Sequence, residues 1–225
     1  MGYYGNHGFV TESAFNRFVN LDNVEWHIID YLAKSKSKYA DYLWKILKYD
    51  TEDCLSQPSL TYEEKMALVY TTNGDATPYR VFMSPYIDDA WEVQSSHLHL
   101  YVDTITPKDH LASVVNVRFE CIVHNKISNI LGDASRFNPD TNPSEMHMNE
   151  VTTPYKNRAT VMLKCVLAEL NGVFVNGVGV LQFNQQVSPY SNGKMSLWNS
   201  RKFYGYSTVL STLMSGVSSE SECGY

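Results

Sequence analysis

Cysteine is scarce in this chain of 225 residues, which has four, and all of them lie far apart. They are Cys54, Cys121, Cys165 and Cys223, and no two form a Cys-x-x-Cys pair. A disulfide framework or a structural zinc site needs cysteines at close and regular spacing. We therefore expect four reduced thiols in a protein that is made in a cytoplasm.

Long apolar runs and excess positive charge are also missing. No apolar run approaches the roughly 18 residues needed to span a bilayer, and the N-terminal residues lack a signal-peptide pattern. We expect no membrane partner. The chain has 18 Lys and Arg against 24 Asp and Glu, a net charge of −6, and its only basic cluster is Lys34, Lys36 and Lys38. This balance argues against wrapping of nucleic acid, although it allows a channel through which DNA passes without specific binding.

The motifs of the common enzyme classes are absent. There is no G-x-S-x-G, no H-E-x-x-H and no Walker Lys-Ser/Thr. The carboxylate pairs Asp88-Asp89 and Glu63-Glu64 consist of adjacent residues, whose side chains point apart, and general acid–base chemistry needs a buried, tuned carboxylate. The sequence therefore predicts no catalytic residues and no cofactor.

One metal site remains as an alternative. His97 and His99 share one face of a predicted half-exposed strand with Asp103, and Cys121 or His124 can lie on a neighbouring strand. Two histidines at this spacing can begin a zinc site, which would suit a metal-dependent hydrolase. No complete ligand set has a recognisable spacing, so we expect these residues to hold no metal.

The clearest local signals run from Thr153 to Phe183. Thr152 and Thr153 are good N-cap residues, and Pro154 fits the first helical position. An apolar stripe then recurs at helical spacing, and Arg158, Lys164 and Glu169 stay off it. The stripe consists of Ala159, Met162, Leu163, Val166, Leu167 and Leu170. This pattern predicts a helix roughly 27 Å long.

A tight stop and a hairpin follow that helix. Asn171-Gly172 can end the helix, because glycine accepts the left-handed conformation at little cost. Asn176-Gly177 then separates the apolar runs 173–175 and 178–183, which is a strong hairpin signal.

A sheet for the helix to pack on is predicted upstream. A short strand is expected over 79–83, and residues 98–102 alternate as a half-buried strand that turns around at 104–108. In the next strand, alternate residues from Ser113 to Val123 form an apolar face toward the helix. Residues 195–214 suggest one or two more strands, or a strand and a short helix.

The fold class predicted from these elements is α+β, an antiparallel sheet packed by an amphipathic helix with a helical N-terminal region. Residues 1–72 form an arm and the helical region, 73–214 the α+β core, and 215–225 a disordered Ser/Glu/Gly-rich tail.

The order of these elements resembles the neck proteins of tailed bacteriophages, of the head–tail connector and tail-terminator kind. The resemblance covers roughly residues 75 to 214: the Tyr79–Pro85 stretch, the strands at Leu98–Asp103 and Val114–Asn125, a long loop, the Pro154–Arg158 helix start, and the Val173–Phe183 hairpin. It implies a structural virion protein, made in the host cytoplasm, that forms a homo-oligomeric ring between portal and tail. It implies no catalytic residues.

Several residues suit contacts between subunits more than they suit a pocket. They are Trp26, Trp44, Tyr101, Arg118, Phe137, Met146 and Met148. Another tail or baseplate adaptor, or a cellular scaffold protein, is the alternative assembly role.

Overall fold

The computed structural model describes residues 21–72, 74–85, 93–108, 112–131, 155–183 and 202–215. Within them the longest helix has 13 residues, and none is long and apolar enough to cross a membrane. The elements, in chain order, are η2 (Leu21–Asn23), α2 (Val24–Lys34), α3 (Lys38–Lys48), η3 (Cys54–Ser56), α4 (Tyr62–Met66), β1 (Val81–Phe82), β2 (Ser96–Pro107), β3 (Ala112–His124), η5 (Asn125–Ile127), β4 (Asn129–Leu131), β5 (Tyr155–Asn157), α5 (Arg158–Leu170), β6 (Val173–Val175), β7 (Gly179–Leu181) and β8 (Phe203–Ser215).

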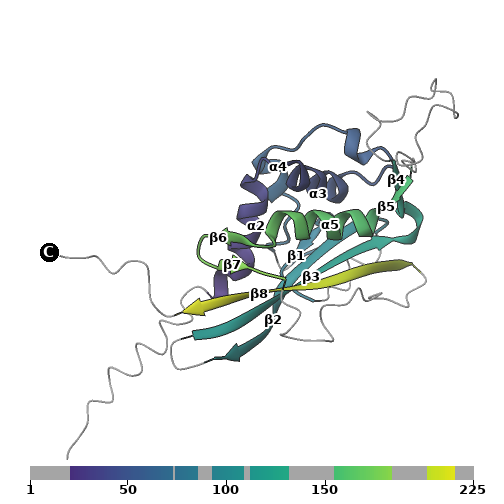
Figure 1. The fold of residues 1–225 in the computed structure, drawn as a ribbon. Coiled ribbons are helices and arrows are strands. Elements are labelled where there is room, and N and C mark those ends of the chain that lie inside the picture. Colours follow the sequence, from purple (N-terminus) through teal and green to yellow (C-terminus); the bar gives the residue numbers. More distant parts are fainter. Residues whose placement is uncertain are drawn as a thin grey trace, which may run out of the picture.

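A four-stranded sheet in the order β1-β2-β3-β8 forms the centre of the fold (Figure 1). The pairs β2–β3 and β3–β8 are antiparallel, and the two-residue β1 runs parallel to β2. The predicted α+β class is confirmed. One correction concerns strand length: 104–107 continues β2 where a turn was expected. Residues 203–215 form one long strand, which is among the alternatives predicted for 195–214.

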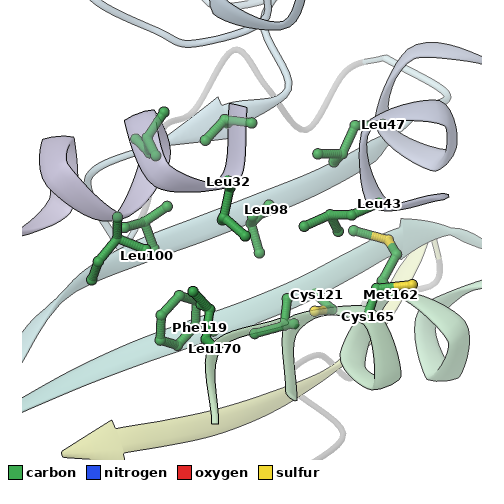
Figure 2. Packing of buried hydrophobic residues seen from close by; sticks show 14 of the residues in the cluster. Leu32, Leu43, Leu47, Leu98, Leu100, Phe119, Cys121, Met162, Cys165 and Leu170 are labelled. Atoms are coloured by element: carbon green, nitrogen blue, oxygen red, sulfur yellow. The ribbon is translucent and has the colours of Figure 1, made fainter. Parts of the chain in front are cut away.

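The helices cover one face of this sheet, and strand alternation explains which face. Val115, Val117, Phe119, Cys121 and Val123 all point toward the helices and are buried, as predicted. Figure 2 shows side chains of α2, α3 and α5 meeting those of β2 and β3 in one cluster. Each fully buried apolar side chain of this kind stabilises the fold by about 2 kcal/mol.

Helix α5 begins later than predicted. Asn157 is its N-cap and accepts a hydrogen bond from the Thr160 N–H at 3.0 Å, so the helix has 13 residues and a length of about 20 Å. Tyr155 to Asn157 form strand β5 instead, paired with β4. Thr152, Thr153 and Pro154 lie outside the described residues.

The stop and the hairpin after α5 are confirmed. Gly172 has a φ of 78°, and β6 pairs with β7 through Val175 and Gly179. The Val178 N–H donates to the Val175 carbonyl, and Gly177, with a φ of 80°, supplies the positive φ that the third position of a type II turn needs. Three residues, 176–178, therefore form the loop between the strands.

Arg158, the first residue of α5, is completely buried at the junction of α5, α3 and the sheet. Its guanidinium donates to the carbonyls of Ile46 (3.1 Å), Tyr49 (2.8 Å) and Thr51 (2.5 Å), so it satisfies the otherwise unpaired end of α3. Burial lowers the pKa of Arg158. The charge is retained there because several carbonyl dipoles converge on it.

Replacing this guanidinium tests its role. We expect Arg158→Met to lower the free energy of unfolding by about 3 to 5 kcal/mol, because it leaves buried carbonyls without donors. Urea denaturation measures the change. Lys156→Met, two residues away and exposed, is the control and should stay within about 0.5 kcal/mol of the parent chain. Equal midpoints for the two variants would contradict the role of Arg158.

The hairpin loop is tested with two glycines. Gly172→Ala and Gly177→Ala each place a side chain at positive φ, which costs about 1 kcal/mol. A Cβ at Gly177 would also lie 2.7 Å from His27 Nε2, whereas none at Gly172 meets an atom within 4 Å. Thermal unfolding should therefore show the larger loss for Gly177→Ala, and His27→Ala should remove the difference. An unchanged melting temperature for Gly177→Ala would contradict the turn.

Candidate functional site

The face of the sheet opposite the helices, which we call the far face, carries polar side chains in pairs. Arg118 donates two hydrogen bonds to the carboxylate of Asp103, at 3.0 and 3.1 Å. Next to this pair, the Tyr101 hydroxyl donates to Glu120 at 3.0 Å. Burial is the main cause that raises the pKa of Glu120 and of the Tyr101 hydroxyl. Each titratable group of this quartet therefore has its partner within the sheet.

A second set of polar contacts extends this pattern along the far face. Asn116 on β3 donates to the Thr104 hydroxyl at 2.7 Å and accepts from the Ser211 hydroxyl at 2.6 Å. The contacts link β2, β3 and β8 in one row. Such cross-strand hydrogen bonds fix the register of the three long strands.

His97 and His99 lie on the far face but are buried, which corrects the expectation of a half-exposed strand. His97 Nε2 lies 2.6 Å from the Ser95 hydroxyl, and His99 Nδ1 lies 2.8 Å from the Ser84 carbonyl. The His99 ring also stacks on Phe82, with centroids 4.8 Å apart. Burial lowers the pKa of His99 to about 4 and that of His97 well below its ordinary value. Both imidazoles are therefore neutral at pH 7.

The zinc alternative gains no ligand set from this arrangement. Asp103 is bound by Arg118, and Cys121 points to the helix face, away from both histidines. Among the described residues, no three His, Cys, Asp or Glu side chains gather as metal ligands. Of the carboxylate pairs, Glu64 caps α4 by accepting from the Thr61 N–H, and Asp88-Asp89 lies outside the described residues.

The predicted contact residues have different positions. Trp26 is 40% exposed on α2, and Tyr101 and Arg118 are half-buried on the far face. Trp44 is 1% exposed, and its indole N–H donates to the Leu32 carbonyl at 3.0 Å, so its side chain serves the core and is not on the surface. Phe137, Met146 and Met148 lie outside the described residues.

A group of exposed apolar side chains, which we call the hairpin patch, was not foreseen. Phe174 is 65% and Val180 40% exposed, and they oppose each other across the β6–β7 hairpin. Val180 and Leu213, the latter 52% exposed, border one cavity of about 360 Å³ together with Val114 and Lys108. Alternation along the hairpin could have indicated this patch, because Val175 and Leu181 face the core.

The comparison with protein families places most of this architecture in one group. A model named YomW matches residues 40–212, from α3 to β8. The chain belongs to the YomW family. This family is phage-related. No curated protein and no solved structure matches the chain.

The YomW match includes the quartet on the far face and the β6–β7 hairpin with Phe174 and Val180. It includes neither Leu213 nor α2 with Trp26. The family therefore supports the predicted phage setting. The family match does not assign a position in the neck.

The buried His99 makes stability depend on pH. Its folded-state pKa of about 4 is below the ordinary value of 6.5, so the unfolded chain binds the extra proton between these values. We expect the free energy of unfolding to fall by about 3 kcal/mol from pH 7 to pH 4 on account of His99. Urea titrations at each pH measure the slope. His99→Gln should flatten it, and an unchanged slope in this variant would contradict the assignment.

Proposed function

We propose that the chain is a structural virion protein that forms a homo-oligomeric ring in the neck of a tailed phage. The ring joins the portal and head to the tail, and DNA passes through it without specific binding. The protein is made in the host cytoplasm and acts in the virion. Membership of a phage-related family supports the viral setting, and the order of elements supports the neck.

The hairpin patch carries this proposal. Exposed apolar groups clustered around a cavity are typical of surfaces that contact another protein. Leu213 lies on β8, and Phe174 lies on the β6–β7 hairpin, whose strand β7 contacts β8. Ile105, 39% exposed, lies on β2, two strands away from β8. Contact between two different sides of the same subunit is heterologous, and such contacts close into rings when the rotation permits.

The net charge and the paired polar side chains suit the wall of a channel that neither binds DNA nor catalyses a reaction. The net charge of −6 gives a surface that repels DNA phosphates, which suits passage without binding. On the far face, Arg118 is bound to Asp103 and Tyr101 to Glu120. We therefore propose that the protein is not an enzyme and uses no metal or cofactor.

Native mass spectrometry of the purified chain tests the ring and reports any bound metal in the same spectrum. We expect a metal-free ring of defined size. Phe174→Asp and Leu213→Asp should each shift the population to monomers, because a carboxylate is costly to bury at a contact. Met83→Asp, on an exposed apolar residue next to β1, is the matched control and should leave the ring intact.

A monomer at every concentration would contradict a ring formed by the isolated chain. Equal loss of the ring in Met83→Asp would contradict the role of the hairpin patch. Immunogold labelling of intact particles then separates the neck from another tail or baseplate position.

A further inference from the structure

A groove lies between α3 and α5, which run side by side above the sheet (Figure 1). Its volume is about 460 Å³, enough for a few amino-acid side chains. It is lined by Tyr39, Tyr42, Leu55, Tyr155, Lys156, Asn157, Thr160, Val161, Lys164 and Cys165.

The charge of this groove is opposite to that of the whole chain. Lys164 Nζ lies 5.8 Å from the ring centre of Tyr39, and Lys38 Nζ lies 5.1 Å from that of Tyr42. Lys156 is exposed at the end formed by β5. The lining residues include no carboxylate, on a chain whose net charge is −6. A basic groove on an acidic protein favours an acidic ligand.

The floor and rim add an apolar component. Leu55 and Val161 line the groove beside the buried Cys165. Tyr39 and Tyr155 are 39% and 52% exposed at the rim. Exposed tyrosines around an apolar floor are typical of peptide-binding surfaces, since each supplies contact area and a hydroxyl at low conformational cost.

We propose that this groove binds an acidic peptide segment of a partner protein, with an apolar or aromatic side chain on the floor and carboxylates on the lysines. The site is independent of the ring, because its residues belong to α3, η3, β5 and α5 and none belongs to the hairpin patch. It gives the protein a second contact, directed at a different chain.

The same lysines and tyrosines could also meet single-stranded nucleic acid, which stacks on aromatic rings. A nucleic acid carries a charge on every phosphate, so it would extend past a groove of this size onto an acidic surface. An acidic peptide confines its carboxylates to the basic rim. The charge distribution therefore favours the peptide.

Fluorescence anisotropy tests the proposal on the full chain with a labelled peptide of sequence GDEFELDG. We expect saturable binding, weakened at least tenfold by Lys164→Glu and by replacing the peptide's acids with Asn and Gln. Lys126→Glu makes the same charge change on an exposed lysine of η5, outside the lining of both the groove and the hairpin-patch cavity, and should leave the affinity within twofold. Thermal unfolding checks that Lys164→Glu remains folded.

No saturable binding up to 1 mM peptide would overturn the proposal, as would equal weakening by Lys126→Glu, since that means general charge attraction. Tighter binding of labelled oligo-dT than of the peptide, lost in Lys164→Glu, would assign the groove to nucleic acid instead. Native mass spectra of Lys164→Glu test ring formation separately from peptide binding, and we expect ring formation not to change.

Discussion

The buried guanidinium of Arg158 is the interaction on which the rest of the architecture depends. It joins the start of α5 to the end of α3, and its contact with Ser96, at 3.4 Å, reaches the start of β2. A buried charge is tolerated only where dipoles surround it, so α3, α5 and the sheet must meet in one arrangement. That arrangement also sets the spacing of the α3–α5 groove, whose two walls are the helices that Arg158 holds together.

The sheet separates two kinds of chemistry. Its helix face is apolar and dry, and it provides the stability. Its far face uses hydrogen-bonded pairs, such as Arg118 with Asp103, and buried neutral imidazoles. Paired groups contribute to register more than to reactivity, which agrees with a structural role for a member of a phage-related family.

Much of the fold could be predicted, because alternation and helical spacing report directly on one buried face. The helix face of β3, the end of α5 at Gly172 and the hairpin were predicted on these grounds. The start of α5 was predicted too early. Pro154 and Asn157 are both residue types that favour the start of a helix, and the pairing of β5 with β4 places the start after Asn157. Periodicity also cannot reveal what covers a second face, so the burial of His97, Trp44 and Arg158 was missed. The α3–α5 groove depends on residues from four elements and has no local signature.

The contact between Glu25 and the outer edge of β2 affects whether a strand of another molecule can extend the sheet. The Glu25 carboxylate accepts the Val102 N–H at 2.9 Å, which occupies a backbone donor that an incoming strand would need. Beyond β1, which pairs with β2 at Leu98 and His99, the edge continues to Pro107, which has no N–H to offer. A strand added there would lack the ladder bonds that the Val102 and Pro107 positions would otherwise supply. Extension of the sheet from one molecule to the next is therefore hindered at this edge.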